Sequence, residues 1–276
     1  MSKAMTRARA ARTPRAEQTA TTQAASTFEP GLRLLPRDLQ LDARRLYGLL
    51  RTIDDLVDEH NPQAASRVKA IERWAHGEEA DTPETRTLSD LAQRHPVPPE
   101  AILEFCEGMR HDLAEGTLAS EADLEHYCQC VGGAIGVVLT RMFGSTDPSC
   151  EGMMAMLGRA FQRTNILRDI DEDHDHGRIY VASRTIERFG APTPGTREAL
   201  MHDQIARADQ LYDEGLDAIP LLSRGGRGMA VSVSLYREIL RQIEREGYGR
   251  ERGRVTVPSW RVHLLVLKHR LKPRYA

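Results

Sequence analysis

Apolar residues recur every three or four positions along most of the chain, which is the spacing of amphipathic helices. In the first clear run, Leu46, Leu49, Ile53 and Val57 keep this spacing until an Asn-Pro pair at 61–62 stops the helix. The same pattern predicts helices over about 68–74, from the prolines at 98–99 to about 113, and over about 120–143, 150–173, 196–219, 229–246 and 259–271. Strict alternation never lasts beyond a few residues, so the predicted fold class is all-α.

Helix start signals and the lack of linkers bear on domain organisation. Ser120 is followed three residues later by Asp123, and such a pair caps the helix that begins there. No Pro/Gly/Ser-rich linker interrupts the pattern after residue 28. We therefore predict one all-α domain over residues 28–276.

The first 27 residues differ in composition from the rest. Up to Ala16 they carry five Lys or Arg residues and no acid, and Ala, Thr and Gln then dominate. They lack the apolar stretch of a secretory signal. A disordered basic leader over residues 1–27 is the favoured interpretation, with a transit peptide and a weak attraction to anionic membrane as alternatives.

Charge and cysteine content narrow the class of protein. The chain has 38 Lys and Arg against 40 Asp and Glu, and this net charge of −2 excludes a nucleic-acid binder driven by bulk charge. Four cysteines are too few for a disulfide scaffold, so a reducing, cytoplasmic compartment is expected. No run approaches the roughly 18 apolar residues of a membrane span, so no spanning helix is expected. A peripheral contact with a membrane stays an alternative.

Acidic residues gather near the end of the first predicted helix. Asp54 and Asp58 stand four apart and share one helical face, with Tyr47 and Arg51 on the same stripe within the two preceding turns. Like charges at this spacing repel, so the cluster requires a compensating cation. Carboxylates are hard oxygen ligands that suit Mg²⁺ bridging to phosphate. A solvated acidic helix end is the alternative for this cluster taken alone.

A second acidic cluster lies more than a hundred residues further on, on the helix predicted over 150–173. One face of that helix carries an amide and three acids, namely Asn165, Asp169, Glu172 and Asp173. Amides are poor core residues and good oxygen ligands. If the two helices face each other, they form a two-sided carboxylate cradle for Mg²⁺ ions and a diphosphate, with Arg51 and Arg168 as its charge partners.

Glycines at 132, 133 and 136 fall inside the helix predicted over 120–143. Each costs a helix interior roughly 1 kcal/mol relative to alanine. Close packing against a neighbouring helix is one interpretation. The other is a kink that admits a long apolar ligand, in which case Gly133 and Gly136 line a substrate pocket. The two interpretations are compatible.

Together these motifs resemble those of the squalene/phytoene synthase family, the head-to-head trans-isoprenyl diphosphate synthases. The resemblance rests on Tyr47 to Glu59 with its paired aspartates, on Tyr127 to Gly136 with its glycines, and on Thr164 to Tyr180 with its Asn-Ile-Leu-Arg-Asp-Ile-Asp-Glu-Asp run. It covers about residues 26–270.

The resemblance implies a single-domain terpenoid-synthase fold with a central cavity and a transferase of isoprenoid and carotenoid biosynthesis. In the family, two prenyl diphosphates condense head to head and diphosphate is released. Phytoene-type C20 substrates are favoured here, and squalene-type C15 substrates are the alternative. Mg²⁺ is the implied cofactor, Mn²⁺ can replace it, and no NADPH is expected. The implied partners are prenyl diphosphates, and the oligomeric state is a monomer or a homodimer.

The resemblance also implies residue roles by motif position. The implied metal ligands are Asp54, Asp58, Asn165, Asp169, Glu172 and Asp173, and the four aspartates also count as catalytic. The implied substrate-binding residues are Ser26, Arg51, Asn165, Arg168, Tyr236 and Arg254. Tyr47 is placed next to the reacting carbons.

The chain departs from the family pattern in four places. Val181-Ala182 follows Tyr180 where Leu-Pro is usual, Arg163 replaces a leucine, Leu49 replaces an aromatic residue, and the usual Arg-Tyr after Asp112 is absent. The altered segment after Tyr180 and the leucine at position 49 motivate a second hypothesis, a divergent member that ionises one prenyl diphosphate and cyclises it or transfers it to another acceptor. A third hypothesis is a non-catalytic assembly factor on the same fold, which the intact acids disfavour.

Overall fold

A computed structural model describes residues 27–271, so Ser26 and nearly all of the expected leader lie outside the described residues. Within this range the chain forms helices and no strand, apart from an isolated β-bridge between Ser145 and Leu222. A short helical segment, 27–32, comes first. It is followed by α2 (Arg37–Asp58), α3 (Ala64–Ala75), α4 (Pro83–Ala92), α5 (Pro99–Leu113), α6 (Glu121–Cys128), α7 (Ala134–Phe143), α8 (Cys150–Asp175), α9 (Ser183–Phe189), α10 (Glu198–Gly215), α11 (Gly226–Arg245) and α12 (Ser259–Leu271).

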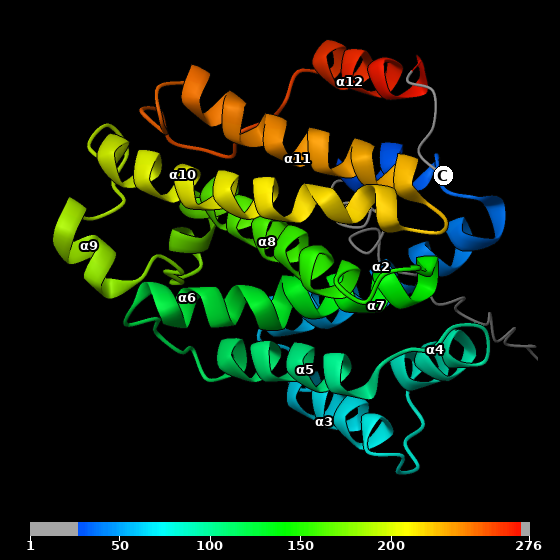
Figure 1. Ribbon diagram of the computed structural model, residues 1–276. Coiled ribbons are helices and arrows are strands. Elements are labelled where there is room, and N and C mark those ends of the chain that lie inside the picture. The colour runs from blue at the N-terminus through cyan, green and yellow to red at the C-terminus, as the bar shows by residue number, and fades with distance from the viewer. Residues whose placement is uncertain (1–26, 272–276) are drawn as a thin grey trace, which may run out of the picture.

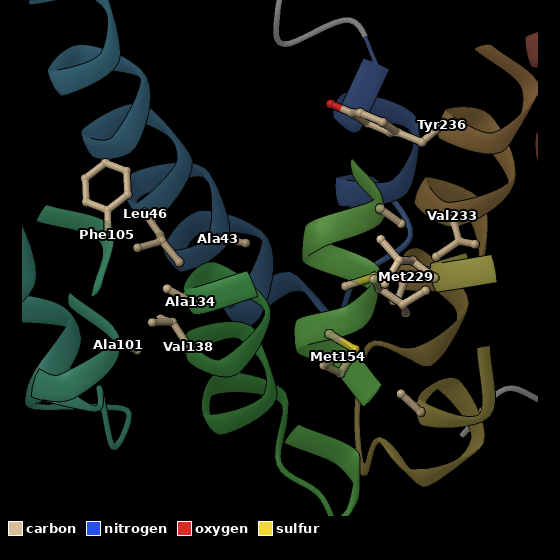
Figure 2. Packing of buried hydrophobic residues seen from close by; sticks show 14 of the residues in the cluster. Ala43, Leu46, Ala101, Phe105, Ala134, Val138, Met154, Met229, Val233 and Tyr236 are labelled. Carbon is tan, nitrogen blue, oxygen red and sulfur yellow. The ribbon is translucent and has the colours of Figure 1, made fainter. Parts of the chain in front are cut away.

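Helix α8 lies in the middle of the assembly, with α10 and α11 on one side and α6 and α7 on the other (Figure 1). Its buried residues fall all around its axis, as expected for a helix enclosed by others. Helices α2, α5 and α7 form a second packed group, in which Leu46, Phe105 and Val138 meet (Figure 2). The two acidic motifs therefore lie on α2 and on the central helix.

The predicted helices form, with differences at their ends. The predicted cap at Ser120 is confirmed, because the backbone N–H of Asp123 donates to Ser120 Oγ at 3.3 Å. The helix predicted over 120–143 is divided by a π-helical turn, Gln129–Gly133, where two glycines weaken the α-helical geometry. The helix predicted over 196–219 ends at Gly215 and continues as a 3₁₀ segment, Leu216–Leu221, which contains a proline. Helices α4 and α9 lack a long apolar period and were not predicted.

Close packing explains two of the glycines singled out above. A Cβ on Gly136 would overlap the backbone oxygen of Met154, and one on Gly132 would overlap that of Gly158. Glycine therefore lets α7 and the π-helical turn approach the backbone of α8. Gly136 faces the α8 backbone, which supports the packing interpretation of this glycine. Gly133 faces the amide end of the Gln129 side chain.

Gly136→Ala is expected to lower the free energy of unfolding by about 1–3 kcal/mol, because the added methyl forces two backbones apart. Gly152→Ala is the matched control, since Gly152 lies on α8 with no heavy atom within 4 Å of the new Cβ. This control should stabilise the protein by up to about 1 kcal/mol. Urea unfolding measures the free energy of unfolding of both variants. Equal changes in the two variants would contradict the packing role of Gly136.

Arg163 is fully buried on α8, at 0% exposure. Its guanidinium forms ion pairs with Glu121 and Glu125 of α6 and donates to Gln204 of α10. A buried charge is tolerated when it is paired and hydrogen-bonded. Arg163, which stands where the family usually has a leucine, thus connects the central helix α8 to α6 and α10.

Candidate active site

The first acidic motif occupies the last turns of α2. Arg51 Nη1 donates to Asp54 Oδ2 at 2.9 Å, and Nη2 lies 2.5 Å from Asp55 Oδ1. Burial, together with the nearby Asp58 carboxylate, raises the pKa of Asp54 to about 7. Arg51 thus pairs with Asp54 and Asp55, and Asp58 is paired by a cation from another segment.

The second motif lies on α8. Arg168 donates to both oxygens of Asp169, from Nε at 2.8 Å and from Nη2 at 2.5 Å, and its side chain is 11% exposed. Burial and the charges of Asp169 and Asp58 raise the pKa of Asp173 to about 8. Asp58 belongs to α2, and its ion pair with Arg178, just beyond α8, brings the ends of the two motifs together.

Arg178, just beyond the C-terminus of α8, connects the two motifs. It forms an ion pair with Asp58 and donates from Nη2 to the backbone oxygen of Val57 at 3.1 Å. Both partners lie on α2. Sequence reasoning gave Arg178 no role in the site, although a cation directly after a run of acids was a signal that could have found it.

A buried carboxylate anchors the segment that follows α8. Asp112, on α5, accepts hydrogen bonds from the hydroxyls of Tyr127 at 2.9 Å and Tyr180 at 3.1 Å. The two tyrosine rings stack with centroids 5.1 Å apart. Val181 and Ala182, which depart from the family pattern, are both buried in the core. The change to Val181-Ala182 therefore leaves the segment after α8 packed into the core, with Tyr180 held on Asp112.

Aromatic rings fill the space between α2, α8 and α11. Phe28 of the 27–32 segment lies with its ring centroid 5.7 Å from Tyr47, 5.6 Å from Phe161 and 4.5 Å from Tyr236. A separate small hollow of about 10 Å³ lies beside Asp173 and is lined by Ile166, Ile170 and Tyr180.

The connection between α11 and α12 brings Arg254 onto the second motif. Its Nη1 donates to Glu172 Oε2 at 3.0 Å, and its Nε lies 3.3 Å from Asp169 Oδ1. Residues 249–253, just before it, are fastened to α8 through Arg197. The guanidinium of Arg197 donates to both oxygens of Asp171 at 2.7 Å and to the backbone oxygen of Gly249 at 2.9 Å.

Asp171 also accepts the backbone N–H of Gly253 at 2.8 Å. Its pKa is lowered despite burial, because Arg197 and this N–H stabilise the charged form. Asp171 sits inside the acidic motif yet turns away from the other acids. The buried Arg197–Asp171 pair thus holds the loop that presents Arg254.

Arg197→Met is expected to lower the free energy of unfolding by about 3–5 kcal/mol, because it leaves the Asp171 charge buried and unpaired. Arg252→Met is the matched control, since its ion pair with Asp175 is 58% exposed on both sides and should contribute about 0–1 kcal/mol. Urea unfolding measures both. If the two variants lose the same stability, Arg197 does not hold the loop.

The donor set fits hard divalent cations. The motifs bring together carboxylates from two helices, and Asn165 Oδ1 is buried without a hydrogen-bond partner among the described residues. A buried, unpartnered amide oxygen beside acids of raised pKa suits a metal ligand. Asp54, Asp58, Asn165, Asp169, Glu172 and Asp173 are the residues that would hold such a cation.

Without metal, stability should fall as the pH rises from about 4 to 8. Asp54 and Asp173 have raised pKa values of about 7 and 8, so in this window the folded protein binds protons that the unfolded chain has lost. Thermal melts in EDTA at several pH values measure the slope, which Mg²⁺ should reduce. Asp173→Asn should make the melting temperature depend less on pH. An unchanged pH dependence in that variant would contradict the raised pKa of Asp173.

Comparison with known proteins agrees with this geometry. The sequence pattern of the squalene/phytoene synthase family matches residues 21–261. A phytoene synthase from Thermus thermophilus is 31% identical over 265 residues, which cover 91% of this chain and 90% of that protein. A presqualene diphosphate synthase from Zymomonas mobilis is 32% identical over 174 residues, which cover 60% of each chain.

Solved structures agree as well. A dehydrosqualene synthase with bound ligand superposes with a TM-score of 0.81 at 26% identity and covers 92% of this chain and 93% of its own. A squalene synthase from Alicyclobacillus acidocaldarius gives a TM-score of 0.71 at 28% identity, over 84% of this chain and 93% of its own. The all-helical architecture is thus the terpenoid-synthase fold. The chain belongs to the squalene/phytoene synthase family and is a prenyltransferase.

Proposed function

We propose that the protein catalyses the Mg²⁺-dependent head-to-head condensation of two prenyl diphosphates with release of diphosphate. The observation that carries the proposal is the ion pair of Arg178 with Asp58, which joins the end of the acidic motif on α8 to the acidic motif on α2. Each motif has its own arginine on its acids, Arg51 on the first and Arg168 on the second. Relatives named phytoene synthase support a C20 substrate and a phytoene-type product.

The residues divide the chemistry between them. Bound Mg²⁺ would neutralise the charge that develops on a departing diphosphate. Arg168 and Arg254 would grip diphosphate oxygens with planar guanidinium groups once the oxygens take the place of Asp169 and Glu172 as their partners. The π-faces of Tyr47, Phe28 and Tyr236 would lie against the allylic cation and keep water away from it.

The named relatives leave two substrate lengths to distinguish. Phytoene synthases point to C20 diphosphates, and the presqualene diphosphate synthase points to the C15 squalene branch. Purified protein with Mg²⁺ should be supplied with C15 or C20 diphosphate separately, and extracted hydrocarbons identified by mass. A C40 hydrocarbon from the C20 substrate supports the proposal. Cyclised C20 hydrocarbon alone would replace it with the single-substrate hypothesis, and no turnover of either substrate would favour a non-catalytic factor.

A further inference from the structure

Helix α12 carries apolar side chains on two opposite faces. Its inner face rests on α11, where Val262, Leu265 and Val266 are half-buried and His269 Nε2 lies 2.7 Å from Ser234 Oγ. The outer face exposes four large apolar side chains, at 59% for Trp260, 56% for Leu264, 50% for Leu267 and 74% for Leu271. Packing on α11 explains the inner face and leaves the outer face without a structural reason.

The outer residues form one continuous stripe. Their spacing of four, three and four positions places them on the same side of a helix that turns about 100° per residue. The stripe extends about 16 Å along the axis at about 1.5 Å per residue. In Figure 1, α12 is the outermost helix on its side of the molecule, beyond α11. We call Trp260, Leu264, Leu267 and Leu271 the α12 stripe.

Basic side chains flank the stripe on both sides. The helical period puts Lys268 and Arg261, which pairs with Glu238, along one edge, and His263 and Arg270 along the other. Lys268 and Arg270 form no ion pair with any acid among residues 27–271. The last acid in the sequence is Glu251, and seven Lys or Arg residues follow it with no further Asp or Glu. An apolar stripe with an unpaired cation along each edge, Lys268 on one and Arg270 on the other, is complementary to an anionic, apolar surface.

We propose that α12 docks the protein onto an anionic lipid surface, with the α12 stripe inserted among the acyl chains and the basic edges at the headgroups. Tryptophan and leucine on one face with Lys and Arg beside them are typical of helices that lie in the membrane interface. No helix of the described residues is long and apolar enough to cross a membrane, so the contact is peripheral. A second copy of this chain is a less suitable partner for the α12 stripe than a lipid surface. A two-fold pairing of α12 helices would set their like charges against each other.

Vesicle sedimentation of the full chain tests this surface independently of turnover. Vesicles of phosphatidylcholine with about a third phosphatidylglycerol should bind the protein, and pure phosphatidylcholine should bind it weakly, because the basic edges are attracted to anionic lipid. Leu264→Ser with Leu267→Ser should weaken binding at least about tenfold, by the scale of burying two leucines. Leu41→Ser is the matched control, a 55% exposed leucine on α2 that should leave binding unchanged.

Tryptophan fluorescence supplies a measurement that needs no stripe variant. In a Trp74→Phe background, Trp260 is the remaining tryptophan, and its emission should shift to the blue and be quenched by brominated lipid. Unquenched Trp260, or vesicle binding that survives the double substitution, would overturn the proposal and assign any binding to another segment. Concentration-dependent dimerisation that the double substitution abolishes, without vesicle binding, would overturn it in favour of a second copy.

Discussion

Replacing Asp54 or Asp169 by asparagine is expected to abolish turnover, with a loss of at least about 10³-fold, while the fold stays intact. Each substitution removes one of the carboxylates proposed to bind the metal, Asp54 on α2 or Asp169 on α8. Asp54 has a pKa raised by burial and by Asp58, so its charge destabilises the metal-free protein. Stability without Mg²⁺ should therefore hold or rise in Asp54→Asn. Steady-state assays and thermal melts with EDTA measure the two effects.

Asp175→Asn is the control for this pair. Asp175 lies at the end of α8, exposed and paired with Arg252, outside the facing acids. It should keep nearly full activity. Full activity in Asp54→Asn or Asp169→Asn would contradict the two-sided cradle, and equal losses in all three variants would show that the assay responds to charge alone.

Arg168→Lys is expected to reduce the rate by about 30- to 150-fold, the equivalent of roughly 2–3 kcal/mol of transition-state stabilisation. Lysine keeps the charge and loses the planar fork with which Arg168 now holds both oxygens of Asp169. Binding of inorganic diphosphate with Mg²⁺, measured by calorimetry, should weaken in parallel.

Arg159→Lys controls for the loss of an arginine on α8. Arg159 pairs with Glu125 of α6, away from the acidic motifs. It should turn over at close to the normal rate. If Arg168→Lys behaves like Arg159→Lys in rate and in diphosphate binding, Arg168 is a structural partner of Asp169, and the second motif needs another diphosphate ligand.

Local patterns predicted most of the helices and both acidic motifs. The three- to four-residue period located α2, α8 and α11, because each buries at least one broad face. Short helices such as α9 bury too few residues to produce a period. The spacing of Asp54 with Asp58, and of Asp169 with Asp173, placed each pair on one face, although sequence spacing alone leaves open whether the two faces meet.

The remaining site residues act through contacts between distant segments, which no local pattern encodes. Arg178 reaches α2 from beyond α8, and Asp112 joins two tyrosines that are 53 positions apart in the sequence. Gly136 is a further case, because the sequence alone does not show which backbone a glycine-rich helix approaches. The structure shows that Gly136 lies against the backbone of α8.

The ratio of diphosphate released to hydrocarbon formed tests head-to-head condensation most directly. Two prenyl diphosphates that join and lose both leaving groups give two diphosphates per hydrocarbon. We predict this ratio of two when the purified protein is incubated with Mg²⁺ and C20 diphosphate, with diphosphate and C40 hydrocarbon quantified in the same reaction. A ratio of one, with a C20 hydrocarbon as the product, would contradict the condensation.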